Sequence, residues 1–285
     1  MRILNGAELR DFIKERQVKQ VRNLRQSWKV FPKLVIFYAS NSPVIKTYIR
    51  LKKTYGEDIL IDVEPIRANA DELQKLIKNA NQNETIHGII VQLPLENHAG
   101  ERLDNSETEE ILATISPEKD VDSLNGGDFD AATATAVNWL ISGYNIELKG
   151  QRIAIIGNGK LVGAPLSKMW QDSGYDVTVF DENTSDEMTK MLNQFDIVVS
   201  AAGVPELIKP EMLKQKAVVI DCGTTSENGT IKGDVAESVR KTRHDLKITP
   251  KIGGVGPLTV AALIDNVIIA ARRVADKNGQ QDLNT

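Results

Sequence analysis

Residues 152–165 read RIAIIGNGKLVGAP and decide the fold of the second half of the chain. An apolar strand runs directly into a glycine-rich turn, and Pro165 lies where a helix begins. In such a unit the free N–H groups and the dipole of the helix attract an anion such as a phosphate. The spacing is GxGxxxG, one residue longer than the common dinucleotide fingerprint. The stretch therefore indicates either a dinucleotide cradle or a tight strand–helix turn that binds nothing.

The next apolar strand ends at two acidic residues, Asp181 and Glu182. An acidic side chain at this strand end accepts hydrogen bonds from a ribose 2′-hydroxyl and repels a 2′-phosphate. No arginine stands there to hold a 2′-phosphate. We therefore predict that the cofactor is NAD rather than NADP. The alternative is a solvated acidic turn with no ligand.

Composition excludes several classes of protein. The chain has 285 residues, enough for two domains or one large domain, and its 41% hydrophobic and 26% charged content is ordinary for a globular protein. Its net charge of -4 predicts no nucleic acid and no membrane as partners. The one cysteine, Cys222, excludes an internal disulfide. Since no apolar run approaches the roughly 20 residues of a membrane span and no signal peptide is visible, we expect a cytoplasmic protein.

Both halves of the chain alternate apolar strands with helices. Asn5 is expected to cap the first helix, at 6–26, and Pro43 to start the second. Because the strands are apolar throughout, we expect parallel sheets covered on both faces. The expected strands lie at 33–39, 58–66, 85–93, 152–157, 176–180, 196–201, 217–222 and 246–249, and the further helices at 71–79, 106–115, 133–144 and 258–277.

The predicted fold class is α/β with two domains. Residues 1–122 are expected to form a parallel-sheet α/β domain, and residues 123–257 a Rossmann-like dinucleotide-binding domain. The long C-terminal helix, within 258–285, is apolar on most of one face, so we expect it to return and pack on the first domain.

Two stretches of the first half point to one crevice. Tyr48 and Lys52 are four residues apart, so a helix places the ring and the amine on the same face. The apolar run at 88–94 predicts a buried strand that ends in the amide of Gln92 and is stopped by Pro94. Ligands of open α/β sheets bind at the carboxyl ends of strands. An aromatic ring, an amine and an amide converging there would suit an enzyme.

Seven short motifs extend this pattern over almost the whole chain. In the order and number of these motifs, the sequence resembles the bifunctional methylenetetrahydrofolate dehydrogenase/methenyltetrahydrofolate cyclohydrolase family. The motifs are YxxxK at 48–52, GIIVQLPL at 88–95, PEKDVD at 117–122, GNGKLVGAP at 157–165, VIDCG at 219–223, GDV at 233–235 and GGVGPLT at 253–259.

The resemblance implies a role for each candidate site residue. Residues 1–122 would be the folate-binding catalytic domain, in which Tyr48 stacks on the pterin, Lys52 is the general acid/base and Gln92 orients it. The resemblance also implies that Asp122, Gly256 and Pro257 bind substrate, and that Thr133, Gly157, Asn158, Gly159, Val162, Gly163 and Thr259 bind NAD or NADP. The acidic strand end adds Asp181 and Glu182 to the expected cofactor-binding residues. The enzyme would transfer hydride from 5,10-methylenetetrahydrofolate to the nicotinamide and hydrolyse the methenyl product to 10-formyltetrahydrofolate.

The sequence departs from the family pattern around the cofactor. The loop after Asp122 is shorter than the family's, and Asn158 and Gly159 replace an Arg-Ser pair, which again favours NAD. The alternatives are a cyclohydrolase with one activity, a catalytically silent folate- or nucleotide-binding protein, and an NAD dehydrogenase with another small substrate. The resemblance implies a homodimer, and the three scattered histidines predict no metal site.

Overall fold

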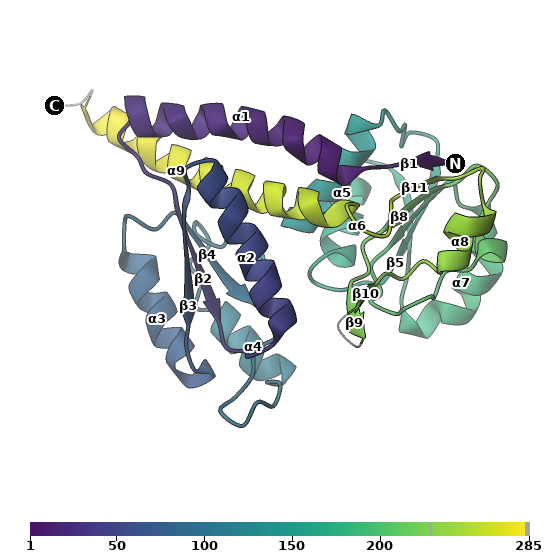
Figure 1. Cartoon of the computed structure of the whole chain (residues 1–285), viewed down its shortest axis with the longest axis horizontal. Coiled ribbons are helices and arrows are strands. Elements are labelled where there is room, and N and C mark those ends of the chain that lie inside the picture. Colours follow the sequence, from purple (N-terminus) through teal and green to yellow (C-terminus); the bar gives the residue numbers. More distant parts are fainter. Residues whose placement is uncertain (228–229, 283–285) are drawn as a thin grey trace. The chain divides into compact units, whose positions relative to one another are not determined.

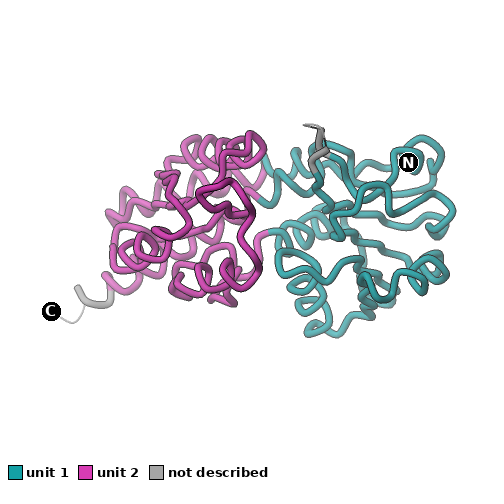
Figure 2. The backbone as a smooth tube through the Cα atoms, turned by 90° about the horizontal axis from the view of Figure 1, so that it is seen from below, with its two compact units in different colours: residues 1–11, 133–259 teal, residues 12–132, 260–285 magenta. Residues whose placement is uncertain are grey.

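The computed structural model describes residues 1–227 and 230–282, and the chain forms two compact units (Figure 2). Unit 1 comprises residues 1–11 and 133–259, and unit 2 comprises residues 12–132 and 260–285. Compared with the predicted division at residue 122, unit 1 includes the N-terminal segment and unit 2 includes residues 123–132. The first of these differences arises because β1 (Arg2–Ile3) pairs with a strand of the second half.

Unit 2 is built on a three-stranded parallel sheet in the order β3-β2-β4. Helices α2 and α3 cover its two faces (Figure 1). On the α3 face, Val35 and Phe37 pack with Leu73 and Ile77. The alternate residues of each strand therefore face α2. The elements are β2 (Lys33–Tyr38), α2 (Pro43–Asp58), β3 (Asp62–Arg67), α3 (Ala70–Gln82), β4 (Gly88–Gln92) and, after this sheet, α4 (Asn105–Leu112).

The expected parallel α/β sheet of the first half is confirmed, but one boundary is wrong. The sequence predicted a strand from Asp58, whereas α2 continues through Asp58 and the strand begins at Asp62. The helix continues because it packs closely on β3 at Gly56, where a methyl group would come within 2.4 Å of the Val63 side chain. The chain then reverses at Leu60, which has φ of 68°.

Two long helices, α1 (Gly6–Ser27) and α9 (Val255–Asp282), begin in unit 1 and continue in unit 2. Within unit 2 they lie side by side (Figure 1). The Gln17 amide, buried on α1, donates to the Ala261 carbonyl at 2.9 Å, and Arg16 pairs with Asp265 at 2.8 Å. The expected return of the C-terminal helix is therefore confirmed; residues 283–285 lie outside the described residues. The predicted cap of α1 is also present, since Asn5 Oδ1 accepts from the Ala7 amide at 3.1 Å.

Helix α9 is long and apolar enough, between Val255 and Gly279, to cross a membrane by length and composition alone. Asp265 and Asn266 interrupt its apolar sequence, so no unbroken apolar run marks it as a membrane span. Its most apolar stretch is 61% buried inside the protein, and Asn266 donates from it to the Val121 carbonyl at 2.8 Å. These contacts are those of a core helix.

Unit 1 contains a six-stranded parallel sheet in the order β1-β11-β8-β7-β5-β6. In chain order the five strands of the second half are arranged 2-1-3-4-5, a doubly wound sheet whose ligand crevice is expected at the ends of its first and third strands, β5 and β7. The sheet is formed by β1, β5 (Arg152–Ile156), β6 (Asp176–Phe180), β7 (Ile197–Ser200), β8 (Val218–Asp221) and β11 (Lys247–Ile248). The other elements are α5 (Ala132–Gly143), α6 (Gly163–Asp172), α7 (Ser185–Met191), α8 (Glu237–Thr242), the 3-10 turns η1 (Glu182–Thr184), η2 (Leu192–Gln194) and η3 (Pro210–Met212), and the hairpin β9 (Thr225–Glu227) with β10 (Thr230–Lys232).

Lys119 of the PEKDVD motif holds the C-terminus of α3. Its Nζ donates to three carbonyls, those of Ala80 at 3.1 Å, Asn81 at 2.7 Å and Asn83 at 2.8 Å. The last carbonyls of a helix have no partner within the helix, and a cation there also complements the helix dipole. Lys119 thus ties α3 to the segment that leads to Asp122.

Replacing Lys119 with methionine removes these three bonds and keeps an apolar stem. We expect the free energy of unfolding to fall by about 2 kcal/mol, in the range for hydrogen bonds from a charged donor. Urea denaturation followed by circular dichroism measures the change. Lys78→Met, at an exposed position of α3, is the matched control and should stay within about 0.5 kcal/mol. Equal losses in both variants would contradict the role of Lys119.

Candidate active site

A lysine and a glutamine form the centre of the candidate site in unit 2. Lys52, in the third turn of α2, donates from Nζ to Gln92 Oε1 at 2.8 Å, and Gln92 is the last residue of β4. The Gln92 amide nitrogen donates to the Leu93 carbonyl at 3.1 Å, which orients its oxygen toward the amine. Both side chains are partly buried. The predicted convergence of amine and amide is present in the structure.

Asp122 is the charged partner of this pair. Burial lowers the pKa of Lys52 from its ordinary value, and the negative charge of Asp122 opposes the shift. Conversely, burial raises the pKa of Asp122, and the charge of Lys52 opposes that shift. The two shifts bring the pKa of the amine and that of the carboxyl group closer together, so a proton leaves Lys52 at a smaller cost than it leaves an exposed amine. Such a pair can act as a general acid and base.

The segment around Asp122 is fixed from both sides. The buried Asp120 carboxylate accepts from the Leu124 amide at 3.2 Å and from the Asn125 amide at 2.8 Å, which folds the chain into a tight loop. On the other side, Asn266 of α9 donates to the carbonyls of Val121 at 2.8 Å and Asp130 at 3.0 Å. Asp122 is held between these anchors.

Tyr48 lies one helical turn before Lys52, so its ring emerges on the same face of α2. It is partly buried, which leaves ring surface for a ligand. Gly256 and Pro257 belong to unit 1, in the first turn of α9. A methyl group on Gly256 would have no atom of the described residues within 4 Å, so the space beside this glycine is open.

The glycine loop of unit 1 is shaped for close approach of a ligand. Gly157 has φ of 95°, and a methyl group on it would come within 2.5 Å of the Ala201 carbonyl oxygen. A methyl group on Gly163 would come within 1.8 Å of the Gly157 oxygen. By contrast, a methyl group on Gly159 would meet no atom of the described residues within 4 Å. Two glycines are thus required by packing, and the third lies under open space.

This geometry fits a dinucleotide. Gly157 follows β5 and packs against Ala201, which follows β7. A doubly wound sheet binds its ligand at the ends of these two neighbouring strands. Asn158 and Gly159 are exposed at the tip of the loop, and Val162 is the N-cap of α6, where the positive end of the helix dipole favours an anion.

The acidic residues after β6 lie at the predicted strand end. Asp181 Oδ1 accepts from the Asn183 amide at 2.9 Å and from Thr184 Oγ1 at 3.2 Å, so this carboxylate caps η1. Glu182 is exposed. Elsewhere in unit 1, Thr259 Oγ1 donates to Thr133 Oγ1 at 3.4 Å, so these two predicted residues are brought together.

The sequence did not point to the buried aspartate that supports the glycine loop. Asp234 Oδ2 accepts from Ser200 Oγ at 2.6 Å and from the Ala202 amide at 2.8 Å, and it thereby fixes the turn that packs on Gly157. Burial raises the pKa of Asp234. Asp234 belongs to the GDV motif at 233–235, but this motif does not indicate that the carboxylate binds Ser200 and Ala202. Among the described residues, no group of three or more His, Cys, Asp or Glu side chains is placed to hold a metal ion.

Two family models match this chain. Residues 4–122 match the catalytic domain of tetrahydrofolate dehydrogenase/cyclohydrolase, and residues 131–275 match the NAD(P)-binding domain of the same family. Together they cover most of the chain.

Individual relatives agree with these models. The chain is 36% identical over 292 residues to the bifunctional protein FolD of Hydrogenobaculum sp., covering 96% of this chain and 99% of the relative. Its fold matches the crystal structure of the bifunctional FolD methylenetetrahydrofolate dehydrogenase/cyclohydrolase of Campylobacter jejuni, with a TM-score of 0.85, 31% identity, and coverage of 96% and 99%. It also matches the Trypanosoma brucei FolD structure, complexed with NADP and an inhibitor, with a TM-score of 0.86, 29% identity, and coverage of 95% and 97%.

Removing the charge of Asp122 should change the titration of Lys52. In the Asp122→Asn variant we expect the pKa of Lys52 to fall further, because the charge that raises it is gone. An NMR pH titration of the labelled lysine measures the shift. Asp58→Asn, which removes a carboxylate of the same helix that pairs with Lys14, is the control and should leave the Lys52 titration unchanged. An upward shift in Asp122→Asn would refute this account of the pair.

Proposed function

Since this chain belongs to the tetrahydrofolate dehydrogenase/cyclohydrolase family, we propose that the Lys52–Gln92–Asp122 cluster is its catalytic centre. The protein is an enzyme of one-carbon metabolism, a methylenetetrahydrofolate dehydrogenase and methenyltetrahydrofolate cyclohydrolase. The observation that carries the proposal is the 2.8 Å hydrogen bond from Lys52 to Gln92 beside the charge of Asp122.

In this proposal Lys52 moves the proton of the hydrolytic step. Water adds to the methenyl bridge of the substrate, and opening of the ring requires a proton to leave the oxygen and another to reach a nitrogen. An amine whose pKa is lowered by burial is a better base near neutral pH than an ordinary lysine. Gln92 keeps the amine in place, since its own amide is held by the Leu93 carbonyl.

The other residues of the site position the substrate. We assign the Tyr48 ring to stacking on the pterin and Asp122 to hydrogen bonding with its polar edge, where a carboxylate complements N–H donors. Gly256 and Pro257 are assigned to the substrate as well. The proximity of Asp122 and Lys52 supports this, because it places a pterin-binding group next to the amine.

The cofactor is a nicotinamide dinucleotide, which when bound accepts a hydride from the methylene bridge. We assign Gly157, Asn158, Gly159, Val162 and Gly163 to its phosphates, and Thr133 and Thr259 to its nicotinamide half. The open space over Gly159 and the N-terminus of α6 support this assignment. Asp181 and Glu182, at the end of β6, would contact the ribose, so we propose a preference for NAD. The Trypanosoma brucei relative was solved with NADP.

Both activities are favoured over a single activity or a silent binding protein. The lysine and its orienting amide have no evident use in folate binding alone, whereas acid–base chemistry requires them. We further propose a homodimer and a cytoplasmic location. Strand β6 is an edge of the six-stranded sheet, and an edge strand is a site where a second copy can associate.

Lys52→Met tests the catalytic assignment. It removes the amine and keeps the length of the side chain. We expect hydrolysis of 5,10-methenyltetrahydrofolate to fall by at least about 100-fold, the usual contribution of a positioned acid–base group. The oxidation step should fall less, because hydride transfer depends mainly on orientation. Both steps are followed spectrophotometrically in one assay.

Lys53→Met is the matched control for that assay. Lys53 is the next residue of α2, is about half exposed and pairs with Glu57 at 3.4 Å. It should keep both activities. Undiminished hydrolysis in Lys52→Met, or an equal loss in both variants, would exclude Lys52 as the proton shuttle.

The cofactor preference is tested by comparing kcat/KM with NAD and with NADP. We expect the enzyme to favour NAD, and the Asp181→Ser variant to narrow the difference by roughly tenfold, since it removes charge repulsion equivalent to about 1.4 kcal/mol. Serine keeps a side-chain acceptor for the Asn183 amide, so η1 should remain capped. Glu211→Ser, on the exposed turn η3, serves as a charge-matched control. A wild-type preference for NADP would refute the assignment.

A further inference from the structure

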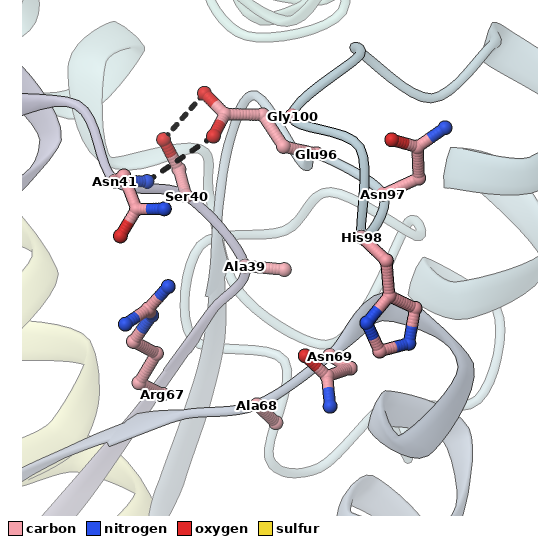
Figure 3. Close-up of a pocket in the computed structure, with 10 residues that line it drawn as sticks. All are labelled: Ala39, Ser40, Asn41, Arg67, Ala68, Asn69, Glu96, Asn97, His98 and Gly100. Carbon is pink, nitrogen blue, oxygen red and sulfur yellow. Dashed lines mark hydrogen bonds between the residues drawn. The ribbon is translucent and has the colours of Figure 1, made fainter.

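A small polar pocket lies at the carboxyl edge of the unit 2 sheet, outside the cluster of Lys52, Gln92 and Asp122. It has a volume of about 90 Å³ and is lined by the loops that follow β2, β3 and β4 (Figure 3). Ala39 and Ala68 leave its centre free of long side chains. We call it the Arg67 pocket; its polar walls include Ser40, Asn41, Arg67, Asn69, Glu96 and His98. The loops meet where the strand order of this sheet reverses, which is where open α/β sheets bind ligands.

Arg67 is the charged residue of this pocket that has no partner among the described residues. It is the last residue of β3 and is exposed, and its guanidinium forms no hydrogen bond or ion pair with any residue that the structure describes. Figure 3 shows its side chain rising toward that of Asn41. A guanidinium presents a fixed fork of donors that suits a carboxylate. The amides of Asn41 and Asn69 add further donors to the same walls.

The other charged groups of the pocket are already engaged. The Glu96 carboxylate accepts from Ser40 Oγ at 2.6 Å and from the backbone N–H of Asn41 at 3.1 Å, so it fixes the loop after β2. His98 Nε2 lies 3.3 Å from Asp71 Oδ1, at an exposed position. Arg67 is therefore the charged residue of this pocket whose hydrogen-bonding groups have no partner among the described residues, and free guanidinium donors bind an anion.

Strand register connects this pocket to the catalytic cluster. Tyr38 of β2 pairs with Gln92 on one side and with Arg67 on the other. Neighbouring strands are about 4.8 Å apart, so the Cα atoms of Gln92 and Arg67 are roughly 10 Å apart. Side chains of paired residues leave a parallel sheet on the same face. Because Gln92 reaches Lys52 on the α2 face, Arg67 emerges on that face too.

We propose that the Arg67 pocket binds the carboxylate of the glutamate arm of the folate substrate. The inference rests on the proposed function, which places the pterin near Lys52, Gln92 and Asp122. A tetrahydrofolate continues from the reacting bridge through a p-aminobenzoyl group to a glutamate with free carboxylates. The separation along the row Gln92–Tyr38–Arg67 matches a ligand whose reacting bridge and anionic end are divided by one aromatic ring. Arg67 thereby contributes to affinity for the substrate and takes no part in proton transfer.

The test compares two substrates in the hydrolysis assay: 5,10-methenyltetrahydrofolate and 5,10-methenyltetrahydropteroate, which lacks the glutamate. Arg67→Ala should raise KM about tenfold for the first substrate, equivalent to about 1.4 kcal/mol. It should not change KM for the second substrate. Arg67→Lys should recover part of the loss, since it keeps the charge without the fork. Arg22→Ala, at an exposed position of α1, is the matched control and should alter neither value.

Two results would overturn the proposal: an unchanged KM for methenyltetrahydrofolate in Arg67→Ala, or an equal rise for both substrates. Wild-type protein that turned over neither substrate would refute the proposed function instead. Titration calorimetry with 5-formyltetrahydrofolate, with and without its glutamate, still tests Arg67 in that case. A glutamate-dependent loss of affinity in Arg67→Ala supports the proposal, and its absence rejects it.

Discussion

The hydrogen bond from Lys52 to Gln92 joins helix α2 to the end of β4, and the candidate site of unit 2 depends on it. An amine is costly to bury, so the structure must hold its partners firmly. Helix α2, which carries Lys52, is fixed by a buried contact in which Tyr55 donates to Gln17 Oε1 at 2.7 Å. Gln17 in turn donates to the backbone of α9. Because helix α2 is fixed in position, Tyr48 and Lys52 are already ordered before a ligand binds, which reduces the entropy lost on binding.

Unit 1 meets a different constraint, the close approach of backbone segments. A side chain at Gly157 or Gly163 would collide with backbone atoms, so glycine is required for packing as well as for ligand access. The Asp234 carboxylate joins β7 to the following turn and keeps Ala201 against Gly157. The glycine loop is consequently shaped by main-chain contacts, whereas the cluster in unit 2 is built from side chains. The exposed Asn158 stands where the family has an arginine. This replacement is compatible with a main-chain site, because the backbone N–H groups of the loop do not depend on the side chain.

Sequence patterns predicted the alternating α/β units, the return of the last helix and the meeting of Lys52 with Gln92. They did so because each rests on local periodicity or on the rule that strand ends share one edge. The patterns missed the pairing of β1 with β11, since a two-residue strand has no periodicity of its own. They also missed what Lys119 and Asp234 bind: their partners are carbonyls and amides of distant segments, which no spacing reveals.

The shortened loop after Asp122 has a physical explanation in contacts with α9. Asn266 binds the carbonyls at both its ends, and the Arg273 guanidinium lies 4.6 Å from the centre of the Phe129 ring. Arg273 also reaches Asp128 Oδ2 at 3.4 Å. A loop anchored in this way needs little length, because α9 rather than the loop itself holds Asp122 in place. The contacts with α9 therefore fix the path of the chain after Asp122 and keep its carboxyl group near Lys52.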